Sequence, residues 1–160
     1  MQDQATLIAT LTSTWFAAGL DPAISARLAA LARPWSADAG TEIFHEGDPS
    51  DLLGIVVRGR VALRTLVPER GEVTILTVEP GDIYGWSAIV PPYRATSTAV
   101  AIEPVDAIVF AGPDLRAALR EDAALAQALY PRVLVAVARR LNATRLQLLD
   151  LFAAEQVRSW

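Results

Sequence analysis

A short stretch in the second half of the chain carries side chains suited to holding a negatively charged group. It reads Gly85-Trp-Ser-Ala-Ile-Val-Pro-Pro-Tyr-Arg-Ala-Thr-Ser97. A short helix that starts near Trp86 would present free backbone N–H groups, and its dipole favours an anion there. Arg94 can form a charge-assisted, bidentate contact with a phosphate or carboxylate, and Thr96 or Ser97 can add a hydroxyl donor. The stretch therefore predicts an anion site.

Several of these residues also admit a purely structural explanation. Arg94 follows a diproline and a tyrosine, and the alternative is a surface ion pair with Glu103 or Asp106. The alternative for Trp86 is a core aromatic residue without a ligand role. Ser87 has the alternative of serving only the start of the short helix.

The other reactive residue types do not form a catalytic or metal-binding set. The chain has no cysteine and a single histidine, His45, so nucleophilic catalysis lacks its usual parts. A cupin-type metal enzyme needs about three histidines and a carboxylate at one site. The carboxylates near the first glycine turn are expected to form a solvated cluster: Glu42, Glu46, Asp48 and Asp51. We predict no enzymatic activity, no cofactor and no metal.

Length and composition favour one folded domain over residues 1–160. The chain is 52% hydrophobic and has a formal net charge of −4, which gives no reason to expect attraction to phosphate backbones. The first residues carry no basic cluster, and no apolar run reaches the roughly 18–20 residues that span a bilayer. We therefore expect a cytoplasmic protein without a membrane segment.

Secondary-structure signals divide the chain into three zones, which together predict an α+β fold. Residues 1–33 are expected to be helical, with Asp21 as N-cap, Pro22 at the first helical position and Pro34 ending the helix. Residues 35–110 contain short strands separated by glycine and proline turns, as in an antiparallel, jelly-roll-like β-roll. The predicted strands are 42–45, 54–57, 60–66, 72–78, 97–101 and 107–110.

Residues 113–157 are expected to be helical again and to contain a long helix from about 131 to about 157. Its apolar residues recur at steps of three and four, which describes a heptad-like seam. We call the following set the C-terminal seam: Leu134, Val137, Leu141, Leu148 and Leu151, with Thr144 as its polar member. The seam predicts a homodimer through residues 131–152. The alternative is that this face simply covers the roll.

Three glycine-marked segments occur in a specific order. They read GTEIFHEGDPSD (40–51), IVVRGRV (55–61) and EPGDIYG (79–85). Gly47 and Gly59 allow positive φ where the chain changes direction. Over roughly residues 20–152, this order resembles the cyclic-nucleotide-binding domains of catabolite activator protein and of protein kinase A regulatory subunits.

The resemblance implies a phosphate-binding cassette at residues 85–97, with Arg94 on the family's phosphate arginine. In catabolite-activator-type proteins the long helix also offers a hydroxyl to the ligand's base, which implies Thr144; the alternative is a tolerated polar residue of the seam. The implied ligand-binding residues are Gly85, Trp86, Ser87, Ala88, Arg94, Ala95, Thr96, Ser97 and Thr144. Trp86 departs from the family, which has there a glutamate that accepts a bond from the ribose 2′-hydroxyl. Losing that bond costs about 1.5–3 kcal/mol.

Two functions fit these observations. The first is a non-catalytic sensor that binds a small anionic ligand, a cyclic nucleotide or another phosphate or carboxylate, and relays binding through the long helix. The second is a ligand-free interaction module, in which Trp86 fills the sugar site and the C-terminal seam dimerises or docks a protein partner. The family's DNA-binding regulators carry a helix-turn-helix domain after the long helix. Only residues 153–160 follow here, so we expect no direct DNA binding.

Overall fold

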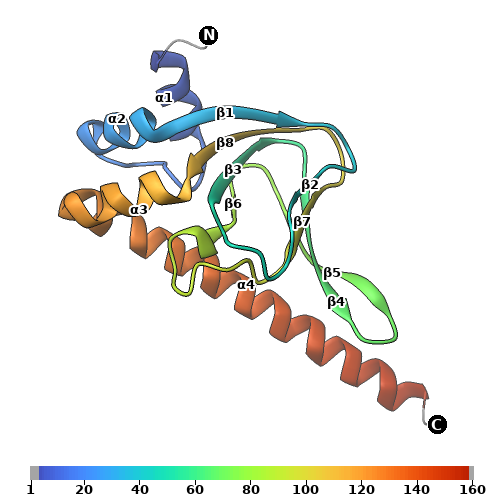
Figure 1. Ribbon diagram of the computed structural model, residues 1–160. Coiled ribbons are helices and arrows are strands. Elements are labelled where there is room, and N and C mark those ends of the chain that lie inside the picture. The colour runs from blue at the N-terminus through green and yellow to red at the C-terminus, as the bar shows by residue number, and fades with distance from the viewer. Residues whose placement is uncertain (1–3, 159–160) are drawn as a thin grey trace.

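Two antiparallel sheets form a roll, and helices flank it (Figure 1). The computed structural model describes residues 4–158, with the side chains of residues 4–149. One sheet has the strand order β1-β8-β3-β6 and the other the order β2-β7-β4-β5. The strands are β1 (Ala32–Ala37), β2 (Glu42–Phe44), β3 (Leu52–Arg58), β4 (Val61–Val67), β5 (Gly71–Val78), β6 (Ile83–Tyr84), β7 (Thr98–Ala101) and β8 (Val105–Ala111). The predicted α+β class and antiparallel β-roll are confirmed.

The predicted strands correspond to β2, β3, β4, β5, β7 and β8, whereas β1 and β6 were not predicted. The prediction of a helix as far as residue 33 was wrong at its end. The structure ends that helix at Leu31 and starts β1 at Ala32, which pairs with Phe110 of β8. Pro34 explains the difference, because a proline disfavours the helical conformation of the residue before it. Strand β6 contains only Ile83 and Tyr84, too few residues for a periodic pattern.

The helices are α1 (Gln4–Ser13), α2 (Pro22–Leu31), the short 3-10 helix η1 (Trp86–Ala88), α3 (Gly112–Glu121) and α4 (Ala123–Arg158). Asp21 caps α2 as predicted, since its carboxylate accepts a hydrogen bond of 2.8 Å from the backbone N–H of Ala23. These caps and turns place α1, α2 and α3 against one face of the roll (Figure 1).

The long helix α4 begins at Ala123, earlier than the start predicted near residue 131. Asp122 serves as its N-cap, accepting a hydrogen bond of 3.0 Å from the backbone N–H of Leu125. Pro131 lies inside the helix rather than at its start. The buried side chains of Leu125 and Leu129 anchor the first turns in the core and offset the backbone bond that the proline removes.

The hydrophobic core has two parts. The first lies between the helices and the β1-β8-β3-β6 sheet, and its fully buried members include Leu11, Phe16, Leu28 and Phe110. The second lies inside the roll and draws on strands of both sheets, with Tyr84 as its largest member. Burial raises the pKa of the Tyr84 hydroxyl above its ordinary value. Strands β3 and β8 contribute buried residues to both parts of the core.

Helix α4 runs along the underside of the roll and continues past it (Figure 1). Its inner residues Val133 and Ala136 are buried, whereas its outer leucines are mostly exposed. The exposed leucines of α4 are Leu134, Leu141, Leu146, Leu148 and Leu149. Of the C-terminal seam, Leu151 lies outside the described side chains. Among the residues described, none of the helices combines the length and hydropathy required to cross a bilayer.

Candidate functional site

The turn after β6 positions the predicted cassette. Gly85 adopts a left-handed conformation, with φ of 74°, and the chain then makes the single 3-10 turn η1. A side chain at this position would overlap the backbone carbonyl oxygen of Leu52 on β3 and would reach within 3.4 Å of the Phe44 ring. Only glycine meets both requirements, a positive φ and a close approach to the neighbouring strand.

The second half of the cassette folds back onto the glycine turn of residues 47–50. The backbone N–H of Ser50 donates to the carbonyl of Tyr93 at 2.8 Å. The backbone of Ala95 bonds on both sides of the same turn, accepting from Gly47 at 2.8 Å and donating to Asp48 at 2.9 Å. Two segments far apart in the sequence are thereby joined, and both contribute residues to a single pocket.

This pocket brings most of the predicted site residues together. It is lined by Phe44, Ser50, Leu63, Gly85, Trp86, Ser87, Ala95, Thr96, Ser97 and Arg140. Its open volume is only about 10 Å³, enough for about one water molecule. The lining side chains therefore leave no room for a larger ligand.

Trp86 belongs both to the edge of the core and to the pocket lining, and its role toward a ligand stays a prediction. Its indole is half-buried and packs against the helix-side part of the core, and it also lines the pocket. The indole N–H can donate a hydrogen bond, but no atom of the ring accepts one from a hydroxyl group. The pocket wall at this position is therefore apolar.

Arg94 points to the surface in this structure. Its side chain is exposed and donates a hydrogen bond of 2.8 Å to the carbonyl of Gly47, and it is not among the residues that line the pocket. The alternative ion pairs do not form, because Glu103 pairs with Arg60 and Asp106 pairs with Arg58. The role of Arg94 as an anion ligand stays a prediction.

Ala88 and Thr144 also lie outside the pocket lining. The carbonyl of Ala88 accepts a hydrogen bond of 2.6 Å from Arg116 of α3, whose guanidinium also stacks 4.6 Å from the centre of the Tyr93 ring. Thr144 is exposed, and its hydroxyl donates to the carbonyl of Arg140 at 2.9 Å. Its contact with a ligand stays a prediction.

Arg140 is the pocket residue that the sequence reasoning missed. It lies one helical turn before Thr144, and its guanidinium donates to the backbone carbonyl of Ile83 at the start of β6. The signal was present, because Val133, Ala136 and Arg140 recur at the spacing of the buried face of α4. A charged residue on an otherwise apolar helix face indicates a polar site beneath that face.

The environment of Arg140 disfavours its charge. Its Nε is buried and has no hydrogen-bond partner. Burial lowers the pKa of the guanidinium, and the nearby Asp82 carboxylate opposes this effect. Within the described part of the chain, no carboxylate lies close enough to Arg140 to form a salt bridge.

Two further arginines hold α4 against the N-terminal segment. Arg132 donates to the carbonyl of Phe16 at 2.9 Å. The guanidinium of Arg139 stacks 4.1 Å from the centre of the Trp15 ring, a cation–π contact. The helix that closes the pocket is therefore tied to residues outside the roll.

Polar side chains of the acidic turn near His45 find their partners within the protein. His45 is exposed, and its Nδ1 lies 3.4 Å from a carboxylate oxygen of Glu42. The Glu46 carboxylate accepts hydrogen bonds from the Thr65 hydroxyl at 2.9 Å and from the Leu66 N–H at 3.3 Å. The side chains described include no group of three or more residues that could hold a metal ion.

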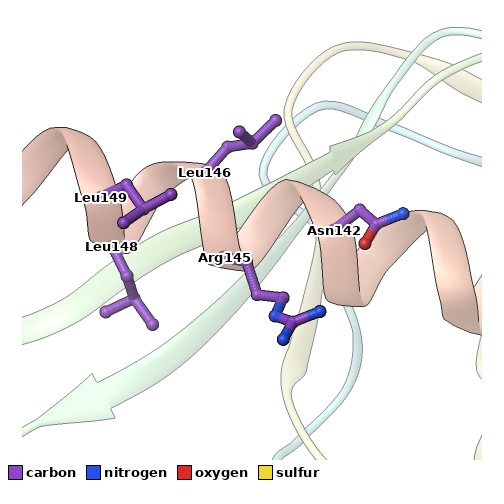
Figure 2. A pocket seen from close by; sticks show the side chains of 5 residues that line it. All are labelled: Asn142, Arg145, Leu146, Leu148 and Leu149. Atoms are coloured by element: carbon purple, nitrogen blue, oxygen red, sulfur yellow. The ribbon is translucent and has the colours of Figure 1, made fainter.

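A larger open hollow lies on the outer part of α4, away from the cassette. Its volume is about 720 Å³, and Figure 2 shows its lining side chains, Asn142, Arg145, Leu146, Leu148 and Leu149, all projecting from the one helix. A site with one wall lacks the convergent polar groups of a ligand pocket. This hollow is an exposed helix face rather than a second binding cleft.

A β-roll whose small pocket is closed by a C-terminal helix defines a ligand-sensing class of domain. Residues 34–122 match the family described as cyclic nucleotide-binding domain, and the chain belongs to this family. The CRP-like cAMP-activated global transcriptional regulator of Mycobacterium tuberculosis is 30% identical over 133 residues, which cover 83% of this chain and 58% of that protein. This chain thus spans 58% of the length of that relative.

Solved structures agree with this assignment. The N-terminal domain of a transcriptional regulator from Streptomyces coelicolor is 32% identical, with a TM-score of 0.65 over 87% of this chain and 94% of that chain. A cyclic nucleotide-binding domain from Methylobacillus flagellatus shares the fold, with a TM-score of 0.77, at 20% identity over 92% of this chain and 83% of that chain. The family supports a ligand-sensing regulatory role.

Proposed function

We propose that this chain is a non-catalytic sensor domain that binds a small anionic ligand and relays its presence through α4. One observation carries the proposal: the cassette and α4 line the same pocket, through Ser87, Ser97 and Arg140. A ligand in this pocket touches both the roll and the helix. Its binding energy therefore depends on where α4 lies.

The size of the pocket supports the relay. An open volume of about 10 Å³ admits no phosphorylated ligand while α4 and Trp86 hold their present positions. Binding therefore requires a second arrangement in which the wall has moved. A ligand that binds only that arrangement shifts the population toward it by its difference in affinity.

Local contacts must also be exchanged on binding. Arg94 would leave the carbonyl of Gly47, an exposed interaction that costs little to give up. The hydroxyl of Thr144 would leave the carbonyl of Arg140 in the same way. Ser87, Thr96 and Ser97 already line the pocket.

Titration calorimetry on the wild-type chain tests the proposal, with cyclic AMP, cyclic GMP, cyclic dinucleotides and inorganic phosphate as ligands. We expect at least one of them to bind, and Arg94→Ala to weaken it by about ten- to a hundredfold, the value of one charge-assisted hydrogen bond. Arg33→Ala is the matched control, because Arg33 is an exposed arginine of β1 that does not line the pocket. If the wild type bound none of these ligands, the proposal would be overturned.

A second function is favoured by the filled pocket together with the exposed leucines of α4. In this alternative the chain binds no ligand, and α4 forms a parallel homodimer or docks a protein partner through residues 131–152. A homodimer is also compatible with the sensor. Sedimentation tests it with Leu141→Arg, and Ile102→Arg is the control, because Ile102 is an exposed apolar residue outside α4. An unchanged mass for Leu141→Arg would remove the dimer.

A further inference from the structure

Arg140 is a half-buried cation whose hydrogen bonds are incomplete. Its guanidinium has one assigned acceptor, the backbone carbonyl of Ile83, and its buried Nε has none. An arginine has five N–H donors in a planar fork that fits the two oxygens of an oxyanion. A buried charge without a paired charge is costly, so a structure that keeps one commonly uses it to bind a ligand.

The other polar groups of the pocket are hydroxyls. Ser50, Ser87, Thr96 and Ser97 line it, and the Ser50 hydroxyl is buried, 3% exposed, without a hydrogen-bond partner. Hydroxyls and a guanidinium donate hydrogen bonds readily to an anion. None of the ten lining residues carries a carboxylate. The pocket therefore supplies hydrogen-bond donors and positive charge, which complement an anion.

The remaining lining residues limit what else a ligand can carry. Phe44, Leu63 and Trp86 offer apolar surface and no side-chain acceptor for the hydroxyls of a sugar. The serine and threonine hydroxyls can accept as well as donate, so the cost to a ribose applies where its hydroxyls face these three side chains. A compact anion has no sugar hydroxyls to place there.

We propose that this pocket takes a compact tetrahedral oxyanion of the phosphate or sulfate class, bound by Arg140 and the Ser50 hydroxyl together with Arg94 of the cassette, and does not select for a nucleoside. This inference rests on the proposed sensor function and names its ligand. On binding, the guanidinium exchanges the carbonyl of Ile83 for the anion. Because Arg140 belongs to α4, this exchange is the step that moves the helix.

Thermal unfolding in phosphate tests this inference, compared with chloride at equal ionic strength. The wild type is expected to gain about 5–10 °C when phosphate is a hundredfold above its dissociation constant. Arg140→Met is expected to lose this gain, and also to unfold no earlier than the wild type in chloride, because a residue of similar volume replaces a half-buried charge that forms no salt bridge within the described residues. Phosphate also stabilises proteins non-specifically, so the quantity that counts is the difference between the two proteins.

Arg139→Met is the matched control, because Arg139 is the adjacent residue of α4 and contacts Trp15 rather than the pocket. It should respond to phosphate like the wild type. Two further variants keep the test decisive if Arg140→Met fails to fold. Arg140→Lys retains the charge without the planar fork, and Ser50→Ala removes a hydroxyl that has no partner in the free protein. Each should weaken phosphate binding about three- to tenfold.

Different failures separate the two proposals. Equal phosphate responses from the wild type, Arg140→Lys and Ser50→Ala would overturn the compact-anion inference. Binding of cyclic AMP that depends on Arg94, without any response to phosphate or sulfate, would also overturn it but would leave the sensor function standing. If the wild type bound neither phosphate, sulfate nor any of the nucleotides, both the sensor function and the compact-anion inference would be overturned.

Discussion

Replacing Gly85 by alanine should be among the most destabilising single changes near the site. The left-handed conformation, with φ of 74°, costs a residue with a side chain about 1–2 kcal/mol. The added methyl group would also overlap the carbonyl oxygen of Leu52, and relieving such overpacking costs about 1–3 kcal/mol. Together these effects predict a loss of about 2–5 kcal/mol. For a chain of this size that is about 4–20 °C in Tm.

Gly47→Ala separates the two contributions. Gly47 also has a positive φ, 87°, but a side chain there would meet no atom within 4 Å. It should therefore show the conformational cost alone, about 2–8 °C in Tm. Calorimetric unfolding of both variants, with urea midpoints as a second measurement, compares them. Equal losses would refute the argument that β6 and the cassette are positioned by close packing of Gly85 on β3.

Three further predictions follow from the described contacts. Phe110→Ala should cost about 3–5 kcal/mol in urea unfolding because the ring is fully buried, whereas a loss below about 1 kcal/mol would show that the core around β8 is loosely packed. Arg116→Ala should cost about 1–3 kcal/mol and weaken ligand binding in calorimetry, because it removes the bond to the carbonyl of Ala88; unchanged affinity would show that α3 does not support the cassette. The bond from Arg27 lowers the pKa of Asp122 below its ordinary 3.8, so this pair stabilises the fold above that pH and the stabilisation is lost as the pH falls through the folded pKa. The Tm difference between wild type and Arg27→Met should therefore shrink below pH 3.8, and a constant difference down to pH 2 would contradict this.

The sequence predicted the roll well because local chemistry marks the turns of its strands. Gly47, Gly59, Gly71 and Gly85 all take positive φ in the structure, and the strands between them have the expected short runs of β-branched residues. The first two residues of β1 were mistaken for helix because Ala32 continues the apolar pattern of α2, and the rest of β1 was not recognised as a strand. Its identity depends on pairing with β8, which no local pattern displays.

The cassette was also within reach of the sequence, because its pocket residues form two short contiguous runs, 85–87 and 95–97. The orientation of Arg94 could not be predicted from the sequence. Its side chain follows the backbone bridge between Pro49 and Arg94, which sets it beside the carbonyl of Gly47. A contact between residues this far apart in the sequence requires the fold to be known.

By itself the sequence determined the class of the fold and the place of the anion-binding candidate, because glycine turns, proline positions and hydrophobic spacing act on neighbouring residues. The tertiary structure decided which charge enters the pocket. Packing α4 against β6 and η1 carries Arg140 into a space formed by residues more than forty positions earlier, and it leaves Arg94 outside. Burial and long-range packing set that outcome, and neither can be read from the spacing of residues along the chain.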